Sequence, residues 1–327
     1  MKPLLDVRNL TTVFHTSAHG TLTAVDDISF SINAGQALSI VGESGCGKSV
    51  TSLSIMRLIP SPPGEIVSGT IFFDGQDLLT LSEKEMQRIR GNKISMIFQE
   101  PMTSLNPVFK IGEQIAEVLH LHEGLHKKAA LARAIELLHQ VGIPSPAQRA
   151  KEFPHQLSGG MRQRVVIAMA LACSPQLIIA DEPTTALDVT IQGQILDLMH
   201  DLAESTGTAL LLITHDLGVV AENAHDVVVM YGGQIVEKAS TEALYTRPLH
   251  PYTVGLMSSI PQIPAQGTPI KKGLLETIPG TVAPLYAQLS GCRFHERCKH
   301  VFAKCKQQEP PLLQPEHGRE VRCWLYE

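Results

Sequence analysis

The sequence predicts an α/β fold in which a mainly parallel β-sheet is covered by helices on both faces. Short apolar segments of strand length, such as ALSIV (37–41), QLIIAD (176–181) and TALLLIT (208–214), alternate with longer amphipathic segments. Strands that are apolar throughout are typical of parallel sheets, because both faces of such sheets are buried. The chain has 327 residues, of which 43% are hydrophobic, which is enough for one large core and a second, smaller unit.

The predicted elements follow one another in a regular order. Residues 4–14 and 23–32 alternate in the manner of strands on either side of a polar turn, which predicts an antiparallel pair. SPPGEIVSG (61–69) is rich in Pro and Gly and predicts a loop. The remaining predictions are helices at 48–59, 127–143, 159–172 and 190–205, and strands at 94–99, 227–231 and 234–239.

A change of composition near Pro261 predicts a domain boundary. IPQIPAQGTPIKKG (260–273) resembles a linker, and the residues after it are rich in Pro, Cys and charged side chains. We therefore expect a first domain at 1–260, with a helical subdomain at about 104–165, and a small C-terminal domain at 261–327.

Several classes of protein are disfavoured by composition. A net charge of −5 and a pI near 6.3 provide no overall basic field for nucleic acid. The first residues, MKPLLDVRNLTTVFHTS, lack the apolar core of a signal peptide, and no run of 18 apolar residues suggests a membrane span. We expect a cytosolic or peripheral protein, in which cysteines stay reduced.

The segment GESGCGKS (42–49) fits the phosphate-loop pattern G-x4-G-K-[ST] between a predicted strand and a predicted helix. Its glycines allow successive backbone N–H groups to point at a phosphate, and the N-terminus of the helix adds partial positive charge. Lys48 is predicted to pair with the β- and γ-phosphates, and Ser49 to ligate Mg²⁺. The predicted nucleotide contacts of this segment are Gly42, Ser44, Gly45, Cys46, Gly47, Lys48, Ser49 and Val50.

The segment LIIADEP supplies acidic groups for the same chemistry. Its apolar strand places Asp181 and Glu182 at the carboxyl end, where open α/β sheets bind ligands. We expect Asp181 to hold the Mg²⁺ ion and Glu182 to orient and deprotonate the attacking water. On their own these residues predict a phosphate-loop NTPase.

The segment LSGGMRQR (157–164), shortly before LIIADEP, narrows the class. With the FQEP loop, the A-L-D turn at 186–188 and LLITHD, the sequence resembles the ATP-binding-cassette (ABC) ATPases over roughly residues 5–260. The resemblance implies a RecA-like, mainly parallel sheet with an antiparallel β subdomain and an α-helical signature subdomain. It also implies a head-to-tail dimer in which ATP is held between two subunits.

The resemblance assigns further roles by position. Phe14 is expected to stack on adenine, Gln99 to ligate Mg²⁺ and His215 to contact the γ-phosphate. Ser158, Gly159 and Gly160 are expected to open a helix whose N–H groups bind the γ-phosphate held by the opposite subunit. Two positions depart from the pattern or vary within it. Met161 replaces the Gln found in many members, and Cys46 occupies a variable position where only backbone N–H groups are needed.

A cassette ATPase without a membrane segment works through partners. EPMTSLNP (100–107), TRPLHPYT (246–253) and the cysteine-bearing tail resemble the first of two ATPases in bacterial peptide and nickel importers. This resemblance implies a related second ATPase in a heterodimer, two permeases gripped by the helical region, an extracytoplasmic binding protein and a position on the cytoplasmic face of the inner membrane. The alternatives are nickel or glutathione uptake, or a soluble cassette protein of DNA repair or translation.

The tail carries four cysteines, Cys292, Cys298, Cys305 and Cys323, without the C-x2-C pairs that are frequent in zinc sites. Four thiolates can hold either zinc or an iron–sulfur cluster. Importers of the resembled subfamily with a similar tail imply a [4Fe–4S] cluster, with Zn²⁺ as the second interpretation and free thiols as the third. We expect Cys46 and Cys173 to be unligated.

Overall fold

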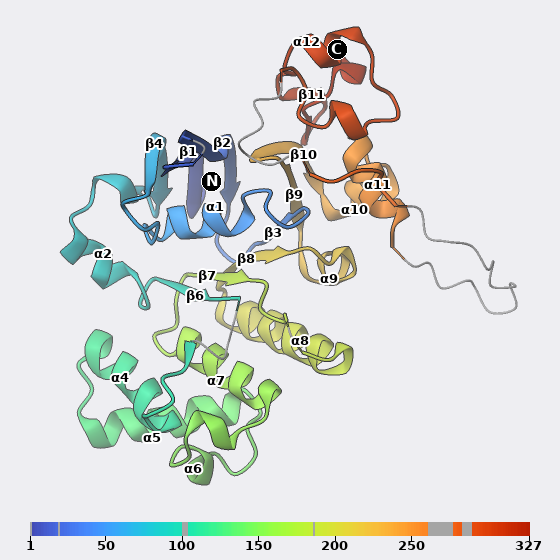
Figure 1. The fold of residues 1–327 in the computed structure, drawn as a ribbon. Coiled ribbons are helices and arrows are strands. Elements are labelled where there is room, and N and C mark those ends of the chain that lie inside the picture. Colours follow the sequence, from blue (N-terminus) through green and yellow to red (C-terminus); the bar gives the residue numbers. More distant parts are fainter. Residues whose placement is uncertain (1, 19, 100–103, 186, 261–276, 283–289) are drawn as a thin grey trace, which may run out of the picture. The chain divides into compact units, whose positions relative to one another are not determined.

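The computed structural model describes residues 2–18, 20–99, 104–185, 187–260, 277–282 and 290–327 (Figure 1). The chain divides into two compact units. Unit 1 comprises Met1–Asp6, Ser31–Ala37 and Ile71–Ile213, and unit 2 comprises Val7–Phe30, Leu38–Thr70 and Thr214–Glu327. The described part of the C-terminal tail therefore belongs to the same unit as the predicted phosphate loop.

Unit 1 contains three parallel strands, β6 (Ile94–Ile97), β7 (Leu177–Asp181) and β8 (Ala209–Thr214). β7 lies in the middle, so that Ile179 is opposite Met96 on one side and Leu211 on the other. Every residue of β7 and β8 is buried. The parallel pairing predicted from continuous apolar segments is confirmed for these strands.

The helices of unit 1 have the amphipathic spacing seen in the sequence. In α5, residues 130, 134, 137 and 138 are buried, so one stripe of this helix faces its neighbours. α5 packs against α4, α6 and α7, and α7 also packs against β6 (Figure 1). The helices are α2 (Glu83–Ile89), α4 (Ile111–Glu123), α5 (Lys127–Gln140), α6 (Pro146–Arg149), α7 (Gly159–Leu171) and α8 (Val189–Thr206).

The first strands form a four-stranded sheet in the order β2-β1-β4-β5. Its strands are β1 (Leu5–Thr16), β2 (Gly20–Ile32), β4 (Gly64–Phe73) and β5 (Gln76–Asp77). The loop predicted at 61–69 is wrong beyond Pro63, because β4 begins at Gly64. The prolines mark only the turn, and the β-branched residues that follow favour a strand whose end buries Ile71 and Phe73.

The second sheet region of unit 2 is mixed. β3 (Ala37–Val41) pairs in parallel with β9 (Asp226–Tyr231), and β9 pairs antiparallel with β10 (Gln234–Ser240). β12 (Arg319–Val321) then pairs antiparallel with β10 and with β11 (Leu313–Glu316), so the tail extends this sheet. The sequence did not predict the last two strands. The helices of this unit are α1 (Lys48–Ile55), α9 (Leu217–Asn223), α10 (Thr241–Thr246), α11 (Pro251–Ser258) and α12 (Ala303–Gln307).

The tail also contributes to the hydrophobic core of unit 2. Phe294 is buried against Tyr231 and Tyr252, with ring centroids 5.2 and 5.5 Å away. Cys292 and Cys298 pack against the same cluster. Residues 261–276, which include almost all of the predicted linker, lie outside the described residues, so the boundary at 261 stays a prediction. Among the described residues, no helix is both long and apolar enough to cross a membrane.

A buried acid organises the region where α11 begins. The carboxylate of Glu237 on β10 is fully buried and accepts hydrogen bonds from the backbone N–H groups of Leu249 and His250, both at 2.8 Å. The guanidinium of Arg319 on β12 donates to the same carboxylate at 3.2 Å. His250 is also buried, which lowers its pKa to about 3 and keeps the ring neutral. Its Nδ1 therefore accepts from the N–H of Tyr252 and caps α11.

We expect Glu237→Ala to destabilise the protein strongly. The substitution leaves two buried amides without their acceptor and removes the buried carboxylate beside Arg319, whose guanidinium keeps the carbonyl oxygen of Arg247. We expect this to cost about 3–5 kcal/mol of unfolding free energy. The measurement is urea unfolding of the purified chain. Glu320→Ala is the matched control, because Glu320 pairs with Lys238 on the same strands but is about a third exposed. The control should lose no more than about 1 kcal/mol; equal losses in both variants would contradict the role of Glu237.

Candidate nucleotide-binding site

The predicted phosphate loop lies between β3 and α1. α1 begins at Lys48, and Gly47 before it has a φ of +103°, in the left-handed region. A Cβ atom at Gly47 would lie 2.5 Å from the carbonyl oxygen of Ala24. Because the backbone conformation favours glycine and a larger residue has no room here, the last glycine of the pattern has a structural reason.

Lys48 is buried, and its ammonium group lies over the loop. Nζ donates to the carbonyl oxygens of Gly42 at 2.7 Å and Glu43 at 3.1 Å. Cys46 is fully buried, and burial raises the pKa of its thiol, so its side chain points into the protein. The side chain of Cys46 is therefore turned away from a ligand in the loop, as its variable position in the pattern suggests. Of the other predicted contacts in this loop, Ser44 and Gly45 are exposed, Gly42 is buried, and Ser49 and Val50 are partly buried.

The acidic half of the predicted site lies in unit 1. Asp181 is buried at the end of β7, and Glu182 follows it with a φ of +45°. The N–H of Glu182 donates to the carbonyl oxygen of Ile213 at 2.9 Å, which extends the parallel pairing by one residue. The Glu182 carboxylate is thereby held at the carboxyl edge of the strands, as the sequence predicts.

Two side chains hold the carboxylate of Glu182. The Gln99 amide donates to its Oε2 at 2.9 Å, and the Thr185 hydroxyl donates to the same oxygen at 3.1 Å. The structure therefore brings Gln99 and Glu182 together, although the two are 83 positions apart. Thr185 is not among the residues predicted from the sequence. Its only signal is the position of a hydroxyl side chain three residues after the acid.

The signature segment opens α7 as predicted. Ser158 is the N-cap residue, and its hydroxyl oxygen accepts from the N–H of Met161 at 3.4 Å. Asp188 caps α8 in the same way, accepting from Ile191 at 3.0 Å. The contact of Ser158, Gly159 and Gly160 with ATP on an opposite subunit stays a prediction.

The predicted site residues are divided between the two units. Gln99, the signature segment and both acids are in unit 1, whereas Phe14, the phosphate loop and His215 are in unit 2. Phe14 is partly buried on β1, and His215 is exposed directly after β8. The roles of Phe14 in adenine stacking and of His215 at the γ-phosphate stay predictions.

The four tail cysteines line one small cavity, together with buried His250 and Phe294. Burial raises the pKa of Cys292 to about 12 and that of Cys323 to about 11, and nearby cysteines contribute to both shifts. These thiols therefore stay protonated unless a positive partner compensates. In the described part of the chain, no three or more His, Cys, Asp and Glu side chains converge as a site for one metal ion.

The strand–loop–helix with its lysine, and the strand ending in two acids, define a phosphate-loop nucleotide-binding protein. Comparison with known proteins identifies a narrower class. The family described as "ABC transporter" matches residues 25–185, and "Oligopeptide/dipeptide transporter, C-terminal region" matches residues 236–305.

Similar proteins span the whole chain. The oligopeptide transport ATP-binding protein AppD of Bacillus subtilis (strain 168) is 54% identical, over 100% of this chain and 98% of AppD. The dipeptide transport ATP-binding protein DppD of the same strain is 47% identical, over 99% of this chain and 95% of DppD. A dimeric, post-hydrolysis structure of the ATP-binding cassette MJ0796 with ADP and Pi is 28% identical, with a TM-score of 0.65, and covers 72% of this chain and 98% of MJ0796.

The chain belongs to the ABC transporter ATP-binding proteins, in the group that carries the oligopeptide/dipeptide transporter C-terminal region. It is therefore an ATP-hydrolysing subunit of a transporter, for which ATP and Mg²⁺ are the expected cofactors. The fold resemblance stated from the sequence is confirmed for the ATPase core.

We expect Glu182→Gln to abolish turnover and to leave ATP binding intact. The amide has nearly the same shape but cannot accept the proton of the attacking water, so the rate of hydrolysis should fall by at least about 100-fold. The measurements are phosphate release and ATP affinity. Glu204→Gln, an exposed change on α8, is the control. Unchanged hydrolysis in Glu182→Gln would contradict the assignment of the base.

Proposed function

We propose that the chain is the ATPase subunit of a bacterial importer for peptides of the dipeptide and oligopeptide class. The observation that carries this proposal is similarity along the whole chain, including the C-terminal region, to ATP-binding proteins named for oligopeptide and dipeptide transport. Glutathione and nickel remain the alternative cargoes, because a binding protein and permeases select the cargo in importers of this kind.

In the proposed mechanism of ATP hydrolysis, each predicted residue has a separate role. The loop N–H groups and Lys48 hold the phosphates, Ser49, Gln99 and Asp181 hold Mg²⁺, and Glu182 takes the proton of the attacking water. The hydrogen bond from Gln99 to Glu182 supports this mechanism, because it joins the proposed Mg²⁺ ligand to the proposed base. Phe14, His215 and the signature residues Ser158, Gly159 and Gly160 complete the proposed site.

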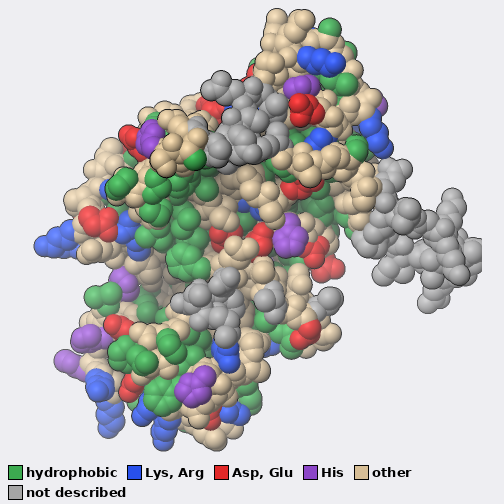
Figure 2. Space-filling view, in the orientation of Figure 1, with side chains coloured by type: hydrophobic (Ala, Val, Ile, Leu, Met, Phe, Trp, Pro, Cys, Tyr) green, Lys and Arg blue, Asp and Glu red, His purple; other side chains and the backbone are tan. Residues whose placement is uncertain are grey.

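The proposed partners are a second, related ATPase in a heterodimer, two permeases and an extracytoplasmic binding protein, at the cytoplasmic face of the inner membrane. Nucleic acid is not a proposed partner. The helical part of unit 1 supports permease docking, because Val108, Phe109 and Leu121 are 71%, 52% and 74% exposed there. Figure 2 shows hydrophobic side chains at this surface among charged ones of both signs. Exposed apolar side chains that form one contiguous patch mark interaction surfaces, and Val108 and Phe109 are neighbours in the chain.

We expect a strain without this chain to lose uptake of labelled dipeptides or short oligopeptides. The wild-type chain should restore uptake, and Glu182→Gln should not, because hydrolysis drives each transport cycle. Uptake of labelled peptides and of radioactive nickel is measured side by side. Loss of nickel uptake with intact peptide uptake would contradict the proposed cargo and would leave the ATPase assignment standing.

We further propose that Cys292, Cys298, Cys305 and Cys323 hold a [4Fe–4S] cluster in a C-terminal domain at 261–327. The placement of all four around one cavity supports this proposal. Zinc, the alternative, would require four sulfur atoms about 2.3 Å from one point. A cube binds each thiolate through a different iron, so its ligands stand farther apart. The cluster would link three segments of a tail that has little core of its own.

We expect anaerobically purified protein to contain about four irons and four sulfides per chain and to be brown. Replacing any of the four cysteines with serine should remove the iron and the colour, because one thiolate ligand is lost. Cys173→Ser is the matched control, since Cys173 lies outside the cavity and should keep the cluster. One zinc per chain without colour would show that the cysteines hold zinc and not a cluster. Absence of both metals would also overturn the proposal.

A further inference from the structure

Glu43 is the first variable residue of the phosphate loop, and each of its polar groups is hydrogen-bonded within unit 2. Its N–H donates to the Tyr252 hydroxyl at 2.8 Å, and its carbonyl oxygen accepts from Lys48 at 3.1 Å. Its carboxylate accepts two hydrogen bonds from the Arg297 guanidinium, at 2.7 and 3.0 Å. Two of these three partners lie more than 200 residues along the chain. Glu43 is therefore fixed from outside the loop.

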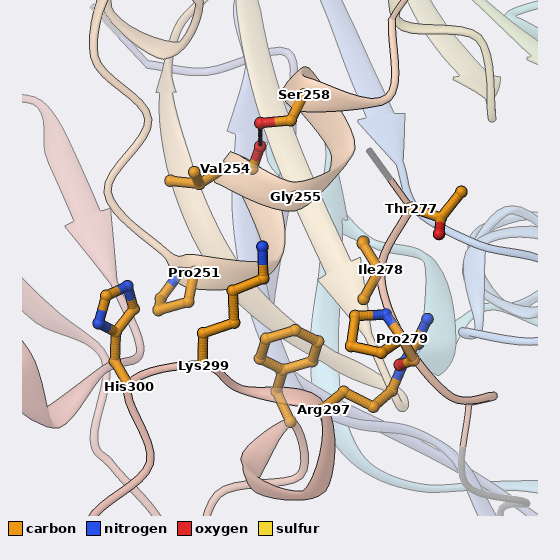
Figure 3. A pocket seen from close by; sticks show the side chains of 11 residues that line it. Pro251, Val254, Gly255, Ser258, Thr277, Ile278, Pro279, Arg297, Lys299 and His300 are labelled. Atoms are coloured by element: carbon orange, nitrogen blue, oxygen red, sulfur yellow. Dashed lines mark hydrogen bonds between the residues drawn. The ribbon is translucent and has the colours of Figure 1, made fainter. Parts of the chain in front are cut away.

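Arg297 is itself held firmly. Its side chain is 7% exposed, and its Nε donates to the carbonyl oxygen of Pro279 at 2.9 Å. Figure 3 shows its side chain lying beside Pro279, at the edge of a cavity formed with α11. The guanidinium carbon also lies 5.7 Å from the centre of the Tyr231 ring. A planar guanidinium with a fixed stem and a bidentate partner defines the orientation of that partner.

The same segment of the tail contacts a second element that binds the loop. Arg293 donates to the carbonyl oxygen of Gly232 and pairs with Asp26. The neighbouring Gly233 donates its N–H to the carbonyl oxygen of Cys46 at 3.0 Å. Residues 292–298 therefore support the phosphate loop near both of its ends.

An ion pair that only held the tail in place would not need Glu43 of the phosphate loop as a partner. Two other ion pairs of the tail, Arg247–Glu316 and Lys304–Glu327, lie on the surface and involve no residue of the loop. The Arg297–Glu43 pair is different because Glu43 belongs to the loop whose N–H groups bind phosphate. Small changes in the direction of these N–H groups weaken every phosphate contact at once.

We propose that Arg297, together with Tyr252, is a positioning residue for the nucleotide and acts through Glu43. In this way the segment 292–298 sets the affinity of the chain for ATP. The proposed effect of Arg297 is on nucleotide binding alone. It does not depend on whether the cysteines hold a cluster, or on whether the cargo is a peptide.

The test is isothermal titration of the purified chain with Mg²⁺ and the non-hydrolysable analogue AMP-PNP. We expect Arg297→Met to raise the Kd by at least about fivefold, the lower range of coupling between sites. In the assembled transporter, the KM for ATP should rise while kcat at saturating ATP stays unchanged, because the loss concerns binding rather than the chemical step. Arg297→Lys keeps the charge but loses the planar guanidinium that makes two hydrogen bonds. Its Kd should lie between those of wild type and Arg297→Met.

The control is Arg247→Met, which breaks an exposed ion pair of the same tail away from the loop and should keep the wild-type Kd. Glu43→Gln provides a second test should Arg297→Met fail to fold, because it removes the charge while keeping the shape of the loop residue. A folded Arg297→Met or Glu43→Gln chain with wild-type affinity would overturn the inference. So would an equal loss of affinity in Arg247→Met. None of these results depends on peptide uptake.

Discussion

A phosphate-binding loop must keep its shape while its own N–H groups remain available for an anion. The loop of this protein meets that constraint through contacts from outside. Gly47 lies against the backbone of Ala24, the carbonyl oxygen of Cys46 accepts from the turn between β9 and β10, and Glu43 is held by α11 and the tail. These contacts connect the loop to segments of unit 2 that lie far apart in the sequence, from Ala24 on β2 to Arg297.

The H-P-Y sequence at 250–252, where α11 begins, has a structural explanation in this arrangement. Glu237 binds the amides that precede α11, and neutral His250 caps the helix. Pro251 suits the first helical position, where a backbone N–H has no helical partner. Tyr252 is then placed with its ring in the core and its hydroxyl on the loop. A buried carboxylate on β10 thus fixes a hydroxyl that orients the nucleotide-binding loop.

The features predicted from sequence are those set by local patterns. The phosphate loop, the acids after β7 and the helix opened by Ser158 each depend on neighbouring residues, so their motifs were sufficient. Glu43 was not predicted because its position in the motif accepts any residue, and its partners, Arg297 and Tyr252, are distant in sequence. β12 was missed for a similar reason, since its three residues form a strand only through pairing with β10 and β11. β4 begins within the segment 61–69, where a loop was predicted, because the prolines end at Pro63 and β-branched residues follow.

The cysteines and the loop anchors share one short segment of chain. Cys292 and Cys298 face the cavity, while Phe294 and Arg297 between them face the core and Glu43. A tight turn at His295–Arg297 joins the two sets, so neither can move far without the other. Coupling between two binding events is reciprocal. If order in this segment favours ATP, then bound ATP must favour order around the cysteines to the same extent.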